Sequence, residues 1–389
     1  MAVWYAHSSN VDINAANLWH THPTNNTPVN FATCDNTVVL SANGKNQIRI
    51  NVDVTCLRLS TVVESGGAIG GSFYYTGTDT AGNPVGAINV TGDVKAATYC
   101  IVVLGETLLT IIGKITSTSN QGALFLMGDN AKARVVGDVE SASSTETISQ
   151  VGNNSELTID GNVTGSTNAD AYGVWVTGSN AALIINGNVT GGLDGTALSV
   201  DGQYNNVTIN GNVTGGTYGL GMGLSCLDGH VRINGNIYAS HDATGMQINV
   251  EAANITLDAD EVHGGGGVDI HGIYNSAAQG KITIKKAVGG SGENSCGIYS
   301  ETTETFNVVI TEAVIGGTNR NSYGFYSRMG NGGAIIKGNI IDSLMCSAIA
   351  GKIRVDVGSA NYYQAYDVND KPKKYGLNAA SPFRRSRFV

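Results

Sequence analysis

One short phrase recurs along this chain at almost constant spacing. The near-copies "DGNVTGS", "NGNVTGG", "NGNVTGG" and "NGNIYAS" begin at Asp160, Asn186, Asn210 and Asn234. A fixed period of this length is typical of repeat architectures, in which each unit buries its apolar face against the next. The aliphatic residues that close the phrase recur every 21 to 26 residues, at Val94, Ile115, Val139, Val163, Val189, Val213, Ile237, Val262, Val288, Val314 and Ile340.

Each phrase also has the alternating pattern of a short strand. A second aliphatic residue usually stands four positions before the closing one, for example at Ile159, Ile185, Ile209 and Ile233. Apolar residues at every other position indicate a strand with one buried face. The "TGG" that often follows favours a turn, because glycine adopts positive φ at little cost. Most repeats hold a second strand pattern, such as "YGVWV" from Tyr172.

These patterns predict an all-β fold, a parallel β-helix (β-solenoid) of eleven or more coils of 24–26 residues. Helical repeats would need amphipathic runs of about 10 or more residues, and propeller blades need roughly 40 residues each. Successive coils stack about 4.8 Å apart, so equivalent side chains lie on one another in columns. We therefore expect aliphatic columns in the core and an amide ladder formed by Asn162, Asn188, Asn212 and Asn236.

The repeat divides the chain into four predicted segments. Residues 1–35 are an N-terminal cap or attachment segment, and residues 36–85 supply the first coils. Residues 86–358 form the parallel β-helix, and residues 359–389 form an irregular tail that is basic at its end. Caps are expected because the end coils of a solenoid would otherwise expose their apolar faces and strand edges.

Charge is unevenly distributed along the chain. The net charge is −9, but the 22 basic residues less the six of the tail leave 16 against 31 acidic residues in the first 370 positions. Such a body repels nucleic acid, which is therefore not an expected partner. The six tail residues are expected to contact an acidic surface of the same chain or of a neighbouring subunit: Lys371, Lys373, Lys374, Arg384, Arg385 and Arg387.

Other features narrow the setting in which the chain folds. No apolar run approaches the roughly 20 residues of a membrane-spanning helix, so membrane insertion is not expected. The start, "MAVWYAHSSN", lacks the basic and apolar regions of a secretory signal. Six cysteines lie far apart without a CxxC motif, which indicates reduced thiols in a cytoplasmic setting. No pattern indicates a cofactor or a metal site.

The first 60 residues, with Trp4, Asn17, Trp19 and the "VLSANGK" stretch from Val39 to Lys45, resemble the start of virion-associated β-helix proteins of tailed bacteriophages. The ending "SPFRRSRFV" is similar to chain ends in such proteins. The resemblance implies a structural role as an appendage, fibre or capsid-surface (decoration) protein, with host attachment as a further role. It also implies assembly in the host cytoplasm, location in the virion and contacts with other virion proteins.

Enzymatic activity is not expected, because no depolymerase signature is matched. Two alternatives stay open, a polysaccharide-degrading tailspike (a glycan hydrolase or lyase) and a bacterial surface adhesin. The tailspike alternative depends on the irregular stretch "NITLDADEVHGGGGVDIHGIY", which we interpret as one residue inserted between Leu257 and Val262. Pairs of carboxyl groups cleave glycosidic bonds, one as proton donor and one as base or nucleophile. The candidates for that alternative are Asp258, Asp260, Glu261 and Asp269.

An aromatic column is the second candidate site. Aligning the second strands predicts one outward column: Trp175, Ser199, Gly221, Gln247, Tyr274, Tyr299 and Tyr326. Three tyrosines in successive coils would form an aromatic track on one face. Such a track is typical of a protein interface, here the contact of a homotrimer, and it could instead bind a host-surface glycan or remain plain surface.

Overall fold

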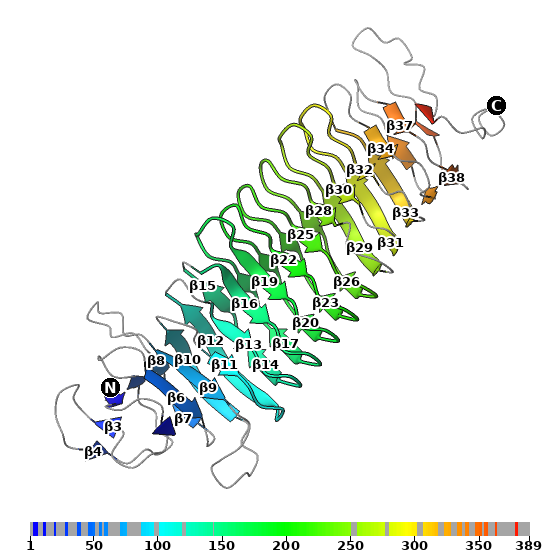
Figure 1. Cartoon of the computed structure of the whole chain (residues 1–389). Helices are drawn as coiled ribbons and strands as arrows, with labels where there is room; N and C mark the ends of the chain where they lie inside the picture. Colours follow the sequence, from blue (N-terminus) through cyan, green and yellow to red (C-terminus); the bar gives the residue numbers. More distant parts are fainter. Residues whose placement is uncertain are drawn as a thin grey trace. The chain divides into compact units, whose positions relative to one another are not determined.

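The structure, a computed structural model, is all β and consists of parallel strands that stack as coils. Side chains are described for residues 101–118, 122–142, 144–249, 255–276, 280–301 and 308–317, and for Phe73, Tyr75, Gly324 and Tyr326. Elsewhere the structure describes only the backbone of the strands. The predicted β-solenoid is therefore confirmed (Figure 1).

The chain forms two compact units, Met1–Asn188 and Val189–Val389, and each is described by itself. In the first unit, sheet A contains β1 (Val3–Ala6), β3 (Trp19–His20), β4 (Pro28–Val29), β5 (Thr37–Val39), β7 (Val54–Cys56), β8 (Arg58–Ser60), β10 (Ala87–Ala96), β12 (Leu109–Ser117), β14 (Lys132–Val136), β15 (Val139–Ser141), β17 (Glu156–Asp160), β18 (Val163–Thr164) and β20 (Ala182–Ile185). Sheet B of this unit contains β2 (Val11–Asp12), β6 (Asn46–Ile50), β9 (Gly71–Tyr75), β11 (Ile101–Val103), β13 (Leu124–Leu126), β16 (Glu146–Gln150) and β19 (Tyr172–Val176).

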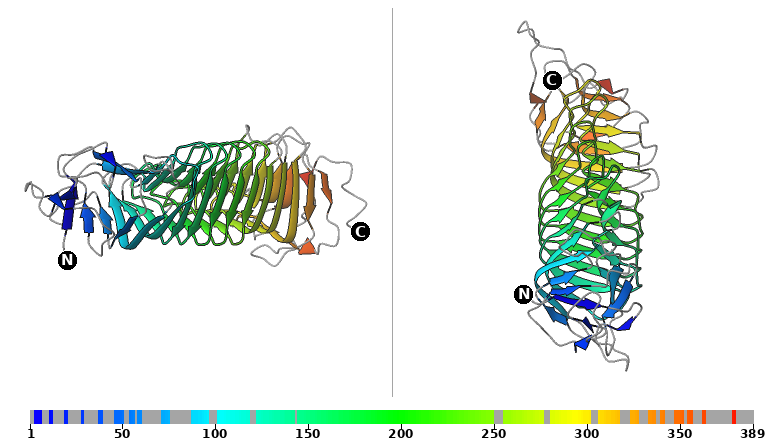
Figure 2. Two further views of the ribbon diagram at one scale, coloured as in Figure 1. Left: turned by 90° about the horizontal axis from the view of Figure 1, so that it is seen from below. Right: turned by 90° about the vertical axis from the view of Figure 1, so that its left-hand side faces the viewer.

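In the second unit, sheet A contains β21 (Val189–Thr190), β23 (Asn206–Ile209), β24 (Val213–Thr214), β26 (His230–Ile233), β27 (Ile237–Tyr238), β29 (Ile255–His263), β31 (Gly280–Val288), β33 (Phe306–Ile315), β35 (Gly333–Ile336), β36 (Asn339–Ile341), β38 (Arg354–Asp356) and β39 (Tyr362–Tyr363). Sheet B contains β22 (Leu198–Val200), β25 (Met222–Leu224), β28 (Met246–Ile248), β30 (Ile273–Asn275), β32 (Ile298–Ser300), β34 (Tyr323–Ser327), β37 (Ser347–Gly351) and β40 (Asn378–Ala379). Within each unit, strands of consecutive coils lie side by side (Figure 2).

The repeated phrase forms sheet A, and its aliphatic residues fill the core. In the first unit Ile159 pairs with Ile185, and in the second Ile209 pairs with Ile233. All four side chains are at most 2% exposed, so the predicted aliphatic column is confirmed within each unit. β-branched residues suit this position because they pack well on a pleated, half-buried surface.

The number of coils is smaller than expected. The structure has about eight turns, whereas eleven or more were predicted. The closing residues at the ends of the repeat, Val94 and Ile340, lie on the parallel strands β10 and β36, whose side chains are outside the described set. The predicted segments 1–35, 36–85 and 359–389 fall largely in the same regions and stay predictions. Within residues 1–35, β1 pairs antiparallel with β3 and β3 with β4, while β1 also pairs in parallel with β5 and β2 with β6.

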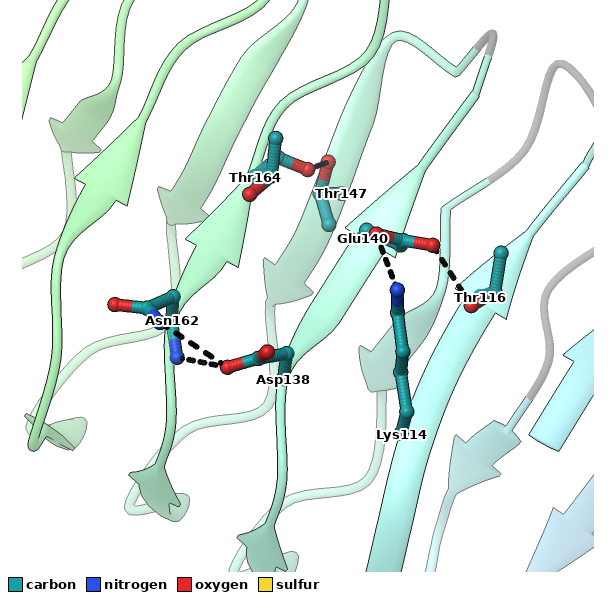
Figure 3. A network of polar contacts seen from close by, with 7 residues as sticks. All are labelled: Lys114, Thr116, Asp138, Glu140, Thr147, Asn162 and Thr164. Atoms are coloured by element: carbon teal, nitrogen blue, oxygen red, sulfur yellow. Dashed lines mark hydrogen bonds and ion pairs between the residues drawn. The ribbon is translucent and has the colours of Figure 1, made fainter. Parts of the chain in front are cut away.

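Polar side chains hold successive coils in register. In the first unit the backbone N–H of Asn162 donates to Oδ1 of Asp138 at 2.7 Å (Figure 3). The backbone N–H of Asn188 donates to Oδ1 of Asn162 at 2.9 Å. In the second unit the backbone N–H of Asn236 donates to Oδ1 of Asn212 at 2.9 Å. The predicted ladder is confirmed, with backbone N–H groups as its donors.

The outer face of sheet A in the first unit carries charges that pair between neighbouring coils. Lys114 lies 2.8 Å from Oε2 of Glu140, whose other oxygen accepts a hydrogen bond from Thr116 at 3.1 Å (Figure 3). Arg134 donates two hydrogen bonds to Asp160, of 2.7 and 2.9 Å. These charged side chains therefore join one coil to the next.

Candidate functional site

The second unit contains a pocket of about 630 Å³ beside sheet B. This volume lies in the range of small-molecule sites, which combine apolar side chains with a few convergent polar groups. Its walls come from strands β28, β30, β32 and β34 and from the turns that precede them. We call it the tyrosine pocket, and it is lined by Thr244, Gln247, Asp269, His271, Tyr274, Asn294, Cys296, Tyr299, Glu301 and Tyr326.

Three of the tyrosines predicted to form an aromatic track lie in this pocket. The register pairs Tyr274 with Tyr299 and Tyr299 with Tyr326. Ring centroids are 5.6 and 5.2 Å apart, with interplanar angles of 9° and 18°, so the rings stack in parallel. The three rings therefore form the stacked aromatic track that the sequence predicted.

Glu301 ties two of these rings together. The hydroxyl of Tyr274 donates to Oε2 at 2.7 Å, and the hydroxyl of Tyr299 donates to Oε1 at 2.9 Å. Glu301 was not predicted as a site residue, although the sequence contains a signal for it. Glu301 stands two positions after Tyr299, and alternate residues of a strand point to the same face.

His271 is a buried titratable residue of the pocket, at 5% exposed. Its Nδ1 accepts a hydrogen bond from the backbone N–H of Cys296 at 3.1 Å, so the neutral ring carries its proton on Nε2. The ring stacks on Tyr299 with centroids 4.6 Å apart. Burial lowers the pKa of His271 to about 4, against the opposing charges of Asp269 and Glu301. The imidazole is therefore uncharged at neutral pH.

The depressed pKa of His271 predicts a loss of stability in acid. The unfolded chain binds a proton near pH 6.5, whereas the folded chain binds it only near pH 4, so stability falls as the pH drops through this window. The expected loss between pH 7 and 4 is about 3 kcal/mol from this residue. Urea unfolding at both pH values measures the free energy of unfolding. Its decrease from pH 7 to 4 should be smaller by this amount in His271→Asn than in the natural chain. An equal pH dependence in both proteins would contradict the assignment.

In the coils that precede Tyr274, the outward column changes from aromatic to non-aromatic residues. Tyr274 pairs in register with Gln247, Gln247 with Gly223, and Gly223 with Ser199. The sequence alignment placed Gly221 in this column, which is wrong. Met222 fills the buried position expected for Leu220, so the outward position belongs to Gly223. The amide of Gln247 donates to Asn249 at 2.9 Å, two residues along its own strand. The pocket thus has a step, from stacked tyrosines to glutamine in one coil and glycine in the next.

Two of the three acidic residues of β29, Asp260 and Glu261, are bound to neighbouring basic groups. Glu261 lies 2.7 Å from Nε2 of His263 and 3.5 Å from Lys286, while Asp260 lies 2.6 Å from Lys285. The hydrogen bond from His263 is the main cause of a lowered pKa of Glu261. Asp258 lies on the same strand, between Arg232 and Thr283 in register. Asp269, the fourth candidate, lines the tyrosine pocket instead.

The structure corrects the local alignment around this strand. Val262 pairs with Ala287, which is fully buried, so Val288 is not the closing residue of its coil. Ile233 pairs with Ala259, and Ile237 pairs with Val262. The first coil has four positions from one paired residue to the other, whereas the second has three. The stretch is therefore one residue shorter than its neighbour, and the inserted residue that we predicted is wrong. One consequence is that Glu261 faces Lys286.

The remaining predicted contact residues lie elsewhere. Trp175 belongs to the first unit, where it stacks on Tyr172 with centroids 5.6 Å apart. The six basic tail residues lie outside the described residues, and their contacts stay a prediction. Cys226 and Cys296 are free and buried, as expected, and burial raises the pKa of Cys226 to about 11.

An exposed apolar strip in the first unit was not anticipated. Leu104, Met127 and Val151 follow strands β11, β13 and β16, in consecutive coils, and are 36%, 53% and 39% exposed. The equivalent position after β19 is the polar Thr177, so the strip belongs to these coils. Aligning the residues after each second strand would have found it.

The part of the chain that is described contains no group of three or more His, Cys, Asp and Glu side chains placed to hold a metal ion. Within the same residues, no helix has the length and apolar character needed to cross a membrane. Comparison of the chain with protein-family models, with curated proteins and with solved structures gives no match. The function must therefore be argued from the fold and the side chains themselves.

Proposed function

We propose that this chain is a structural protein of a tailed-phage virion, a β-solenoid appendage, fibre or capsid-surface protein. One observation carries the structural role: the polar side chains of the coils bind the neighbouring coil. The Asp138–Asn162–Asn188 ladder and the Lys114–Glu140 ion pair are examples. Columns of this kind keep coils in register. The phage setting is supported by the resemblance of the N-terminal segment, from Trp4 to Lys45.

The acidic residues of β29 support the depolymerase alternative less well than they support the structural role. A glycosidase needs one carboxyl group that is protonated near neutral pH, so that it can donate a proton to the leaving oxygen. The lowered pKa of Glu261 holds this group in its ionised form. Asp260 forms an ion pair with Lys285, with 2.6 Å between its Oδ1 and the lysine Nζ. The charges on β29 therefore favour a role in coil stacking.

The other parts of the proposal concern partners. Contacts with other virion proteins are predictions from the resemblance, and a homotrimer is the prediction drawn from the aromatic column. The strip of Leu104, Met127 and Val151 offers an exposed apolar surface, the kind of surface that marks protein interfaces. Because the tyrosine track lines a pocket, we assign subunit contact to this strip in preference to the tyrosines.

Purified chain is expected to release no reducing ends from capsular polysaccharide or lipopolysaccharide. The matched variant Glu261→Gln removes the charge and keeps the side-chain size, and it should leave this result unchanged. The measurement is a reducing-sugar assay over several hours at pH 5 to 8. Release of reducing ends by the natural chain, abolished in Glu261→Gln or Asp260→Asn, would contradict the structural role and establish the tailspike alternative.

A further inference from the structure

We propose that the tyrosine pocket binds an uncharged glycan, with one sugar ring packed on the side of Tyr274 that faces Gln247. The inference goes beyond the structural role and does not depend on it. It is carried by three observations: the step at Tyr274, the mixture of donors and acceptors around it, and the sign of the charges in the pocket.

The step determines where a ligand can lie. On one side, the ring of Tyr274 stacks with that of Tyr299. On the other side, the column continues with Gln247 in the preceding coil and with Gly223, which has no side chain, in the coil before that. The amide of Gln247 turns along its own strand to Asn249. The apolar face of Tyr274 and the polar groups of Thr244 and Gln247 thus border one space. An aromatic face attracts the polarised C–H groups on one side of a sugar ring, because the face carries partial negative charge.

The polar groups match hydroxyl groups, which both donate and accept hydrogen bonds. Acceptors are available on the carboxylate of Asp269, and the side-chain amide of Asn294 supplies both kinds of group. Nε2 of the neutral His271 carries a hydrogen, so this ring adds a donor. Asp269 and Asn294 both have positive φ, 59° and 56°, and occupy equivalent turns in consecutive coils. The pocket is therefore bordered by a repeated polar turn.

The charges of the pocket select against acidic sugars. Among the described residues that line it are two carboxylates, Asp269 and Glu301, and neither lysine nor arginine. His271 adds no positive charge at neutral pH, because its pKa is about 4. A uronic or sialic acid residue would meet like charge in a partly desolvated site. The volume of about 630 Å³ exceeds the needs of a single cation and suits a short oligosaccharide.

The test is binding of the full-length chain to an array that presents neutral hexose and N-acetylhexosamine oligosaccharides beside uronic-acid and sialic-acid ones. We expect binding to neutral members, and a Kd for the best one that rises at least about tenfold in Tyr274→Ala. Tyr274→Phe keeps the ring face and should stay within about threefold of the natural chain. Tyr218→Ala, an exposed tyrosine outside the pocket lining, is the control and should bind normally.

Circular dichroism of each variant shows whether it is folded, and Tyr274→Phe keeps the test valid if Tyr274→Ala unfolds. Binding to acidic glycans alone would overturn the proposal, as would neutral-glycan binding that survives Tyr274→Ala in a folded protein. Binding of tri-arginine peptide at the same site, with no neutral glycan bound, would show that the pocket accepts cations instead. Shortened glycan recovered after binding would contradict the structural function while supporting this inference.

Discussion

Replacing Ile185 with Ala is expected to lower the free energy of unfolding by about 2–5 kcal/mol, as for other large-to-small changes in cores. The side chain is fully buried and lies on Ile159 of the neighbouring coil. Truncation leaves a cavity that the rigid stack of coils can close only in part. Urea unfolding followed by circular dichroism measures the difference. Ile209, equally buried in the second unit, should behave in the same way.

The adjacent residue provides a matched control. Ile184 has the same side chain as Ile185 and lies on the same strand, but it points outward and is 41% exposed. Ile184→Ala should therefore cost less than about 1 kcal/mol, since surface substitutions rarely cost more. An equal loss of unfolding free energy in Ile185→Ala and Ile184→Ala would show that the buried and exposed positions of this strand are assigned wrongly.

Replacing Gly216 with Ala is expected to destabilise the protein by about 3 kcal/mol or more, at the upper end of overpacking effects. This residue is the last glycine of a "TGG" turn. A Cβ atom here would overlap the carbonyl oxygen of Gly192, the equivalent glycine of the preceding coil. Because the obstacle is backbone, a rotamer change cannot relieve it. Thermal unfolding should show a clearly lower Tm, or the variant should fail to fold.

Gly223 is the matched control for that substitution. A Cβ atom at this position would meet nothing closer than Oγ of Ser199, at 3.7 Å. Gly223→Ala should be neutral, or stabilising by up to about 1 kcal/mol through the reduced freedom of the unfolded chain. If Gly216→Ala unfolds at the same temperature as Gly223→Ala, the close approach of the two turns is wrong.

The repeat pattern was sufficient to predict the fold and most of the core. Aliphatic side chains such as Ile159 and Ile209 occur with a period that only stacked coils can bury, so the columns and the Asn162–Asn188 ladder follow directly. The pattern failed where spacing changes. In the coil of Val288, either Ala287 or Val288 could close the coil, and the burial of the small Ala287, which pairs with Val262, decided between them.

The candidate site could be predicted only in part. The column of Tyr274, Tyr299 and Tyr326 follows from aligned strands, and the structure confirms that the rings stack. The pocket beside them could not be foreseen, because it depends on the turns at Asp269 and Asn294 and on the burial of His271. These features come from the path of the chain between strands, which carries no regular pattern in the sequence.

Electron microscopy of phage particles whose genome encodes this sequence, labelled with a gold-conjugated antibody against the chain, tests the central claim most directly. A structural virion protein should be labelled at one fixed position on intact particles, whether on head, tail or baseplate. Particles lacking the gene are the control and should show neither the label nor the density at that position. Particles that carry no label, with the chain found only free in lysed host cells, would contradict the proposed function.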